Sequence, residues 1–400
     1  MKNNTNSRKL PAKILSILYS LTFIVFIAVI IKLDILPITT VVLIGSILAI
    51  LSLVIVLQLC SNKIKTFAKI LASCLSVVLI CGFVTTSVYA MQTLSFLSDT
   101  SVHNKEKALP VIKEPFNVCI TGIDVDGEID EQGRSDVNMI VTVNPTTGKI
   151  LLTSIPRDYE IYLSDYNNAT DKLTHTGFID TETTIKAEED LLGINIDKYV
   201  KINFSTVTEF IDAIGGVDVY SDYEFTPVKK KDWTVQKGIN HMNGKEALAF
   251  ARERKAFIDG DIQRTKNQQA VFEALIEKST SSKNLLLNYS KILSSLKKYF
   301  EMSFSSEEIK SLIKYQLVKT PDWEIYKNTL VGGDSTIPTY STGSTPVYVM
   351  SQNQESIDNA KKLINGVMSG DNILKDKDGN LYLESEIIND DTTDEDTQSE

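Results

Sequence analysis

The chain has 400 residues, enough for one sizeable domain with additional segments, and its charge is divided sharply along its length. Residues 1–91 contain eight Lys or Arg and one acidic residue, Asp34; subtracting these from the totals leaves 33 basic and 50 acidic residues from Gln92 onward, a net charge of −17. Domains that bind nucleic acid are normally basic, so we expect no nucleic-acid partner. Four cysteines, three of them in apolar N-terminal segments, indicate no disulfide framework.

Three uncharged apolar stretches follow one another at the N-terminus: Ile14–Ile31, Ile35–Cys60 and Ile70–Met91. Each reaches the roughly 18–20 residues that a helix needs to cross a bilayer. Asp34 and Pro37 favour a tight turn between the first two. A cleavable signal peptide is the alternative for the first stretch, but two further spans follow it. The sequence therefore predicts three transmembrane helices embedded in membrane lipid.

The basic residues around these stretches predict their orientation. Lys2, Arg8, Lys9 and Lys13 precede the first stretch, Lys63, Lys65 and Lys69 separate the second from the third, and only Lys32 lies between the first two. The positive-inside rule then places the N-terminus in the cytoplasm. Because the number of spans is odd, we expect a multi-pass cell-membrane protein whose residues after Met91 are extracytoplasmic. This location excludes ATP and chromosomal DNA as partners.

After an expected linker at residues 92–114, strand and helix patterns alternate. The expected strands are Phe116–Asp124, Asp136–Asn144, Lys149–Ile155, Lys198–Phe204 and Val217–Tyr220, and the expected helices are Thr181–Leu192, Ser205–Ile214, Asn243–Arg254 and Asp261–Glu277. The Pro145–Gly148 turn predicts a hairpin between the second and third strands, and Gly215–Gly216 should end a helix. This order predicts an α/β fold with helices on a mixed sheet.

Beyond Lys278 the pattern is more helical. We expect helices at Asn284–Phe300 and Ser305–Val318, strands and turns at Asp322–Met350, and a final helix at Gln352–Val367; Ser305 and Glu308 have the spacing of a capping box. Residues 384–400 contain eight acidic residues and no basic one, which predicts a disordered tail. The expected domains are 1–91 (cytoplasmic N-terminus and spans), 92–114 (linker), 115–280 (core of the exterior domain), 281–383 (C-terminal part of the exterior domain) and 384–400 (tail).

Cationic and acidic side chains gather at the expected ends of strands and starts of helices. The candidates are Asp124, Arg134, Asp136, Arg157, Asp158, Lys172, His175, Arg252, Arg254, Asp261, Arg264 and Gln268. Guanidinium groups bind phosphate oxygens bidentately and stay charged, and several at one place repel each other unless a polyanion lies between them. A pyrophosphate meets that need. Asp124 and Asp136 offer hard oxygen ligands for Mg²⁺ or Mn²⁺.

Each of these features has a plainer interpretation. An Arg-x-Arg pair is usually a solvated face, an aspartate at a strand end is usually a turn or cap residue, and Asp261 with Arg264 is spaced for an ordinary intrahelical ion pair. His175 could be a turn residue, and three histidines make no zinc site credible. No Ser-x-x-Lys, Gly-x-Ser-x-Gly or Walker pattern occurs in a suitable context. The combination of the features within one block is what supports a site.

The block Phe116–Val271 resembles the LytR-CpsA-Psr family of Gram-positive envelope enzymes. The matching segments, in order, are GID, GRSDVNMIVTVNP, SIPRD, DKLTHT, INF, IGGVDV, MNGKEALAFARER and GDIQRTKNQQ. The resemblance implies an α/β/α sandwich around a mixed sheet, with an apolar pocket for a prenyl tail. It also implies transfer of wall teichoic acid, capsule or a related glycopolymer from a polyprenyl-pyrophosphate carrier to peptidoglycan.

The matching positions imply roles for individual residues. Asp124 and Asp136 would hold Mg²⁺, and the pyrophosphate would be lined by Arg134, Arg157, Lys172, Arg252, Arg254, Arg264 and Gln268. Asp261 would orient an arginine or help the metal site. We expect phosphoryl transfer with Asp124, Arg157, Arg252 and Arg254 as catalytic residues, Asp124 being the candidate that accepts the attacking proton.

The chain departs from the family pattern in two places. The family often has a basic residue just before the glutamine, where this chain has Asn267, and this would weaken the grip on the head group or reflect a different glycan. Three spans instead of one is also a variant arrangement.

Three rival functions remain. They are a hydrolase that cleaves the same pyrophosphate with water, a non-catalytic membrane-bound regulator of envelope synthesis, and a lipid-binding scaffold without turnover.

Overall fold

The protein is described from a computed structural model that covers residues 9–61, 64–100, 109–125, 129, 132–280, 300–377 and 379–387. The chain divides into two compact units. One consists of residues 1–98 with 313–319, and the other of residues 99–312 with 320–400.

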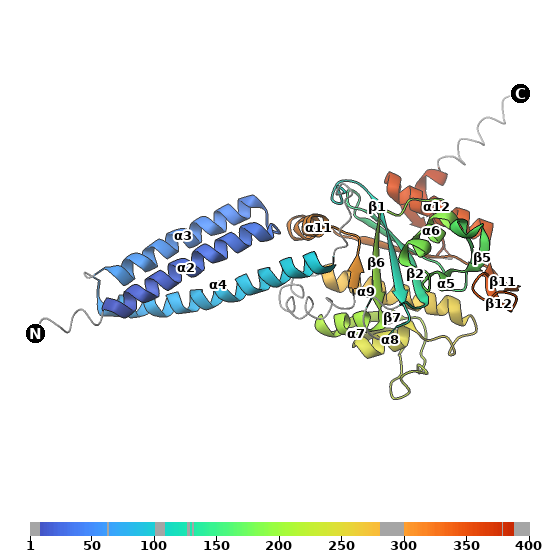
Figure 1. Ribbon diagram of the computed structural model, residues 1–400, viewed down its shortest axis with the longest axis horizontal. Coiled ribbons are helices and arrows are strands. Elements are labelled where there is room, and N and C mark those ends of the chain that lie inside the picture. The colour runs from blue at the N-terminus through green and yellow to red at the C-terminus, as the bar shows by residue number, and fades with distance from the viewer. Residues whose placement is uncertain are drawn as a thin grey trace, which may run out of the picture. The chain divides into compact units, whose positions relative to one another are not determined.

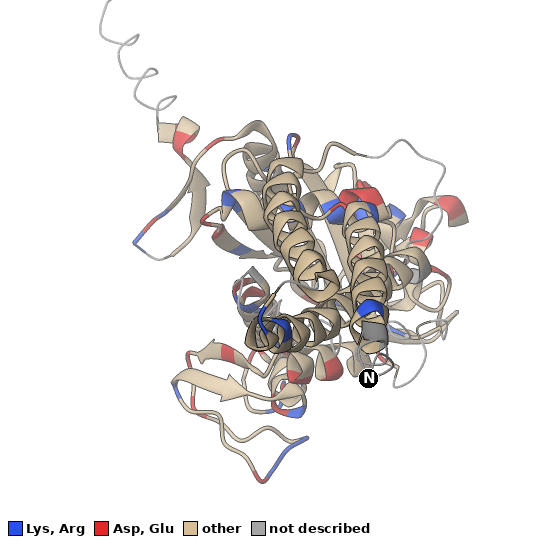
Figure 2. Cartoon of the chain, turned by 90° about the vertical axis from the view of Figure 1, so that its left-hand side faces the viewer, with Lys and Arg blue, Asp and Glu red and all other residues tan. Residues whose placement is uncertain are grey.

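The first unit contains three apolar helices, α2 (Lys9–Leu33), α3 (Ile38–Cys60) and α4 (Thr66–Thr100) (Figure 1). Each contains a stretch long and apolar enough to cross a membrane, as predicted, and Figure 2 shows that charged residues are sparse along them. The helix of the third span is longer than the predicted stretch at both ends. The turn expected between the first two spans is present, with Asp34 at a φ of 49° and Pro37 capping α3.

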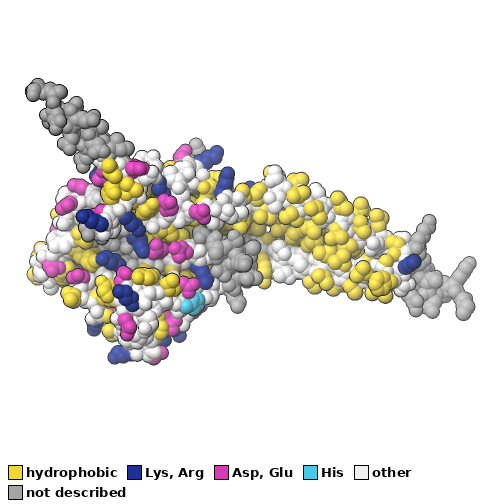
Figure 3. All heavy atoms as spheres, turned by 180° about the vertical axis from the view of Figure 1, so that it is seen from behind, with side chains coloured by type: hydrophobic (Ala, Val, Ile, Leu, Met, Phe, Trp, Pro, Cys, Tyr) yellow, Lys and Arg dark blue, Asp and Glu magenta, His cyan; other side chains and the backbone are white. Residues whose placement is uncertain are grey.

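The faces of these helices differ in what they contact. Tyr19 and Phe83 are buried between the helices, and the Tyr19 hydroxyl lies 2.8 Å from Ser52 Oγ. Phe26 stacks on Phe83 with ring centroids 4.7 Å apart. Large aliphatic side chains cover much of the outer surface (Figure 3). An apolar exterior around a packed interior is the arrangement that a lipid environment stabilises.

The second unit is built on a six-stranded mixed sheet. In spatial order its strands are β10 (Glu324–Thr329), β3 (Lys149–Ser154), β2 (Ser135–Asn144), β1 (Phe116–Ile123), β6 (Lys198–Asn203) and β9 (Phe300–Met302). The β1–β2, β2–β3 and β6–β9 pairs are antiparallel, so the predicted hairpin is confirmed, whereas β1–β6 and β3–β10 are parallel. All eight residues of β1 are buried, as a largely apolar segment predicts for a central strand covered on both faces.

Helices cover both faces of this sheet, so the predicted α/β/α arrangement is confirmed (Figure 1). One layer contains α5 (Leu173–Thr176), α6 (Thr181–Leu192) and α12 (Gln354–Ser369), and the other contains α7 (Phe204–Ala213), α8 (Gly244–Ala251) and α9 (Gly260–Thr280). The sequence explains several ends. Asp180 caps α6 by accepting a bond from Thr183 N, and Gly193 ends it in the left-handed conformation.

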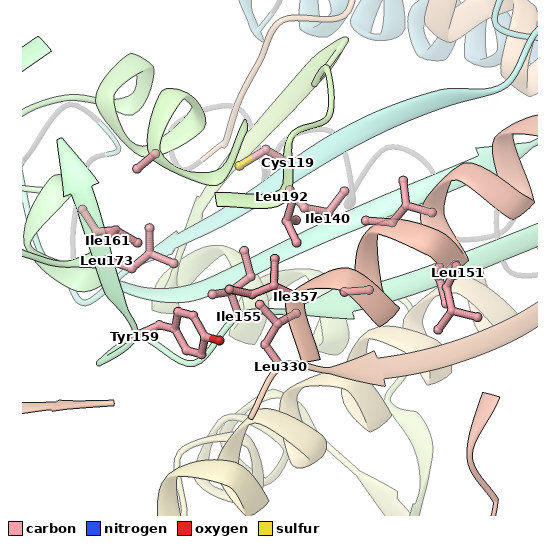
Figure 4. Packing of buried hydrophobic residues seen from close by; sticks show 14 of the residues in the cluster. Cys119, Ile140, Leu151, Ile155, Tyr159, Ile161, Leu173, Leu192, Leu330 and Ile357 are labelled. Atoms are coloured by element: carbon pink, nitrogen blue, oxygen red, sulfur yellow. The ribbon is translucent and has the colours of Figure 1, made fainter. Parts of the chain in front are cut away.

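The core of the first layer forms where α6 and α12 pack on the sheet. Cys119, Ile140 and Leu151 of the strands contact Leu192 and Leu363 of the helices. Figure 4 shows these strand side chains and those of α12 filling the space between sheet and helix. This packing holds the strand ends that carry the charged residues.

Four two-stranded hairpins and the first part of a further helix, as far as Leu312, complete the second unit. The hairpins are β4 (Glu160–Leu163) with β5 (Ala169–Lys172), β7 (Val217–Ser221) with β8 (Gly238–Met242), β11 (Gly333–Pro338) with β12 (Pro346–Ser351), and β13 (Ile373–Lys375) with β14 (Leu381–Leu383). A short 3₁₀ helix, η1 (Ser164–Tyr166), follows β4. The helix is α11 (Ser306–Lys319), and the capping box between Ser305 and Glu308 is confirmed.

Some expectations for the C-terminal part were wrong or untested. The helix expected at Asn284–Phe300 lies outside the described residues up to residue 299, and Phe300 itself begins β9. The helix expected to be final is α12, but β13, β14 and a helical turn at residues 384–387 follow it. That turn was assigned to the acidic tail, and residues 388–400 lie outside the described residues.

Candidate functional site

The charged residues lie at one edge of the sheet because of its topology. The parallel strands β1, β3 and β6 all end at this edge, and antiparallel β2 begins there. Asp124 directly follows β1, and Asp136 lies at the start of β2, where Ile123 pairs with Ser135. Five of the six arginines in the chain lie in segments that reach this edge. The carboxyl ends of strands in open α/β sheets are the usual place for ligand sites.

The best-ordered contact joins Arg157 to Asp136. Arg157 Nη1 donates to both carboxylate oxygens of Asp136, at 3.0 and 3.2 Å. The Thr174 hydroxyl, on the short helix α5, donates to the same carboxylate at 3.3 Å. The side chains of Arg157 and Asp136 retain 16% and 12% of their exposure, so both can still reach a ligand from outside.

A second carboxylate, Asp158, joins Arg157 to Lys172. Arg157 Nε donates to Asp158 at 3.3 Å, and Lys172 Nζ donates to the other oxygen at 3.0 Å. The Lys172 ammonium also lies 5.8 Å from the centre of the Tyr348 ring, whose hydroxyl donates to Asp334. Tyr348, on β12, therefore forms an aromatic wall beside the lysine.

Asp261 joins two further arginines. Arg264 Nη2 lies 3.1 Å and Arg254 Nη1 lies 3.4 Å from the same oxygen of Asp261. Gln268, one helical turn after Arg264 on α9, donates to the backbone oxygen of Asp136 at 3.4 Å. The expected shared helix face of Asp261, Arg264 and Gln268 is therefore directed at the same edge as Arg157.

Two predicted residues lie apart from this network. Arg252 Nη2 is 3.4 Å from Asp124, and its guanidinium lies 3.9 Å from the centre of the Phe204 ring. Arg134 is exposed, and its side chain makes no ion pair with any described residue, although its backbone oxygen accepts a bond from Asp124 N. The structure thus brings Arg157, Arg254 and Arg264 together with Lys172, and leaves Arg134 free at the margin within the described part of the chain.

Burial and the neighbouring charges both shift the pKa values of residues in the site. Burial lowers the pKa of Arg157, but Asp136 and Asp158 outweigh it, so the pKa lies above its ordinary value. Burial raises the pKa of Asp158, but Arg157 and Lys172 outweigh this and lower it. Burial and the nearby Arg157 and Arg254 lower the pKa of Arg264 to about 10 despite the attraction of Asp261. All three groups are charged at neutral pH.

Cations outnumber carboxylates at this edge among the described residues. Six cationic side chains (Arg134, Arg157, Lys172, Arg252, Arg254 and Arg264) stand against five carboxylates (Asp124, Asp136, Asp158, Glu253 and Asp261). Arg264 is 4% exposed, and its buried Nε has no hydrogen-bond partner among the described residues. Crowded cations with spare donors require an anion to balance them, and a pyrophosphate provides several acceptor oxygens.

The carboxylate oxygens at this edge supply only part of the ligands that a divalent cation needs. Asp124 and Asp136 lie on neighbouring strands, and both carboxylates are partly exposed. Among the described residues no group of three or more His, Cys, Asp and Glu side chains surrounds a common point. Two carboxylates suit Mg²⁺ or Mn²⁺ when phosphate oxygens and water supply the remaining ligands. Any metal here would therefore be bound together with a phosphorylated substrate.

Sequence reasoning missed several residues of the site. Asp158 was noted without a role, although it joins Arg157 to Lys172, and Thr174 was part of a quoted motif only. Tyr348 carried no local signal, because it reaches the site from a hairpin far along the chain. Glu253, between Arg252 and Arg254, is 3% exposed and accepts bonds from three backbone N–H groups.

The side chains of Asn267 and His175 are engaged by other parts of the fold. Asn267 is 3% exposed, donates to Phe250 O and accepts from Gln263, so it joins α9 to α8. Its side chain is engaged inside the fold, and the expected effect of the missing basic residue on head-group binding stays a prediction. His175 Nδ1 lies 2.6 Å from Asp171, which also accepts a bond from the hydroxyl of Ser341. His175 therefore lies in the short helix α5 and not in a turn, and its ring is engaged by Asp171.

Residues 84–362 match the LytR_cpsA_psr family. The chain belongs to this family. Among its relatives, polyisoprenyl-teichoic acid--peptidoglycan teichoic acid transferase TagU of Bacillus anthracis (strain CDC 684 / NRRL 3495) is 32% identical over 197 residues, which cover 49% of this chain and 63% of TagU. The chain therefore matches less than two thirds of that relative's length.

Solved structures of the family share the fold. The crystal structure of B. subtilis TagV aligns with a TM-score of 0.53 and 26% identity over 64% of this chain and 98% of TagV. The structure of TagT bound to LI-WTA aligns with a TM-score of 0.52 and 26% identity over 68% of this chain and 97% of TagT. The LytR_cpsA_psr fold of the second unit therefore supports the resemblance that its motifs suggested.

Proposed function

We propose that this protein transfers a glycopolymer, such as a teichoic acid, a capsular polysaccharide or a related polymer, from a polyprenyl-pyrophosphate carrier to peptidoglycan. The observation that carries the proposal is the gathering of Arg157, Arg254, Arg264 and Lys172 at one sheet edge with too few carboxylates to neutralise them. The names of the relatives support the same activity.

The reaction would be a phosphoryl transfer. An acceptor hydroxyl of peptidoglycan attacks the phosphorus next to the glycan, a new P–O bond forms, and the bond to the bridging oxygen breaks to release polyprenyl phosphate. Arg157 and Arg254 would stabilise the negative charge that develops on the oxygens of the diphosphate. Asp124, which is partly exposed, is the group we assign to take the proton of the attacking hydroxyl.

A divalent cation would complete the charge balance. Asp124 and Asp136 would hold Mg²⁺ or Mn²⁺, which when bound supplies Lewis-acid stabilisation to the phosphate oxygens. Arg157 orients the Asp136 carboxylate for this role through its two hydrogen bonds. Lys172 orients Asp158, the other carboxylate that Arg157 contacts.

We also propose that the second unit faces the outside of the cell. The three candidate spans are consistent with anchoring in the membrane, and the basic residues that flank them favour a cytoplasmic N-terminus. In this orientation the site meets both a lipid-linked donor at the membrane and peptidoglycan beyond it.

The test is a transfer assay with the full-length protein in detergent, a labelled lipid-linked polymer and peptidoglycan, with and without Mg²⁺. We expect an acceptor-dependent, metal-dependent product. The Arg252→Ala/Arg254→Ala double variant should lose at least about 100-fold in kcat, because each removed guanidinium stabilises developing charge. Both side chains are partly exposed, so the fold should be kept. The Lys375→Ala/Lys377→Ala variant is a charge-matched control on the β13–β14 hairpin and should retain activity.

The same assay separates the rivals. Release of free phosphorylated glycan without acceptor would indicate a hydrolase, and carrier binding without any product would indicate a scaffold. Undiminished transfer by the Arg252→Ala/Arg254→Ala variant would contradict the proposed role of these arginines.

A further inference from the structure

Two loops beside the arginine site are packed against each other. One loop, residues 222–237, joins β7 to β8, and the other, residues 252–259, joins α8 to α9 and carries Arg252 and Arg254. The ring of Phe257 meets the ring of Phe225 edge-on with centroids 4.8 Å apart, and it lies 5.5 Å from the ring of Tyr223. Aromatic pairs of this geometry hold the two loops together.

A buried carboxylate reinforces this packing. Glu253 Oε2 accepts a bond from Val228 N at 2.6 Å, and Glu253 Oε1 accepts bonds from Arg254 N and Ala256 N at 3.1 Å each. Glu253 therefore fixes the tip of the first loop directly beside the backbone of Arg254. Phe225 and Val235 pair across the base of the tip through two backbone hydrogen bonds.

The tip fixed in this way is cationic. Residues 226–234 contain Lys229, Lys230 and Lys231 and one acidic residue, Asp232, which pairs with Lys230. Lys229 and Lys231 are exposed and make no ion pair with a described residue, and the same holds for Lys255 on the neighbouring loop. These three ammonium groups stand out because the chain from Gln92 onward has 33 basic and 50 acidic residues, a net charge of −17.

An acidic domain repels a polyanion everywhere except where cations are concentrated. The arginine site neutralises the diphosphate of the carrier, but a polymer with a phosphodiester in every repeat brings further negative charges past that site. Flexible lysines are suited to such a partner, since they act as mobile point charges and do not demand the fixed geometry of an arginine fork.

We propose that Lys229, Lys231 and Lys255 form a polymer track that binds the phosphate groups of an anionic glycopolymer beyond its first sugar. This inference rests on the proposed function and deepens it by naming a second cationic contact for the donor substrate, at the phosphodiesters of a charged polymer. Glu253 is the positioning residue that keeps the track beside Arg254.

The test measures binding of fluorescent poly(glycerol phosphate), free of any lipid carrier, to the full-length protein in detergent at low ionic strength. The Lys229→Gln/Lys231→Gln/Lys255→Gln variant should bind about tenfold more weakly, and the steep salt dependence of the wild type should become shallower. The Lys361→Gln/Lys375→Gln/Lys377→Gln variant loses the same charge from exposed lysines elsewhere in the second unit and should bind like the wild type. An uncharged dextran should bind equally weakly to all three.

A second arm measures transfer of a short, uncharged lipid-linked glycan, which should proceed equally with the wild type and the track variant. Equal poly(glycerol phosphate) affinity in the wild type and the track variant would overturn the proposal, as would an equal loss in the control variant. A track variant that loses transfer of the short glycan as well would show that these lysines serve the arginine site itself. Absence of transfer by the wild type contradicts the proposed function, whereas the binding arm still decides the polymer track.

Discussion

Glu188 is a residue that none of the site chemistry uses and that the fold nevertheless buries completely. It lies on α6 against β1, is 0% exposed, and no nitrogen or oxygen donor among the described residues reaches its carboxylate. Burial raises the pKa of Glu188 to about 8, and the neighbouring Cys119 thiol offsets only part of this rise. The side chain is therefore a neutral acid in the folded protein at physiological pH.

The raised pKa predicts that the second unit becomes less stable as the pH rises. Below the ordinary pKa of 4.5 both the folded and the unfolded states hold the proton; above it the unfolded chain ionises first, so stability falls until the pH passes about 8. Between pH 5.5 and 8.5 this amounts to about 3 kcal/mol. Glu188→Gln should flatten the pH dependence of the free energy of unfolding, measured by denaturant titration of the full-length protein. Parallel profiles for the wild type and the variant would contradict the account.

At the same scale, the site shows which residues local patterns reveal. Asp136, Arg157 and Lys172 were predicted because charged side chains directly at strand ends have no packing role there, and each now contacts another site residue. Tyr348 and Glu253 were not predicted. Tyr348 is brought to Lys172 only by tertiary folding, and a glutamate between two arginines looks like a solvated neighbour until its three backbone donors are seen.

The bounds of largely apolar strands and of helices with clear capping residues were predicted closely. The helix α6 has the predicted bounds, Thr181–Leu192, because Asp180 and Gly193 mark both ends. Short strands such as β8 and β13 escaped prediction, since they alternate weakly and depend on their partners, whereas β7 and the strands within residues 322–350 were expected. Their pairing follows from tertiary contacts that no window of the sequence contains.

Gly177 shows how tightly one element fixes the site. A Cβ at this position, just after α5, would collide with the backbone oxygen of Gly133 and lie 2.7 Å from Ser135 N. Gly177→Ala should therefore push away the segment that leads into β2 and carries Arg134 and Asp136, with a cost of about 1–3 kcal/mol. Thermal unfolding and transfer activity should both fall.

The matched control is Gly82→Ala in α4, where an added Cβ meets no atom within 4 Å. This variant should keep the stability and activity of the wild type. A Gly177→Ala protein as stable and as active as the wild type would show that the start of β2 tolerates displacement and that the site is less rigidly held than the packing indicates.

At the scale of the whole molecule, the location of the charged site depends on the orientation of three helices. An impermeant thiol reagent should label Lys377→Cys in intact cells, in a background from which the native cysteines have been removed. Lys65→Cys, between α3 and α4, should be labelled only after permeabilisation. The reverse pattern would place the second unit in the cytoplasm, where a membrane-bound regulator becomes the better account.

The central claim is that arginines and two aspartates at one sheet edge bind a lipid diphosphate. Its most direct test compares the affinities of the full-length protein for a polyprenyl diphosphate and the matching monophosphate, each with and without Mg²⁺. The account predicts at least about tenfold tighter binding of the diphosphate, a gain that requires Mg²⁺ and is lost in Asp136→Asn, because the second phosphate adds charge-assisted hydrogen bonds and metal contacts. Equal affinity for the two lipids under all conditions would contradict it.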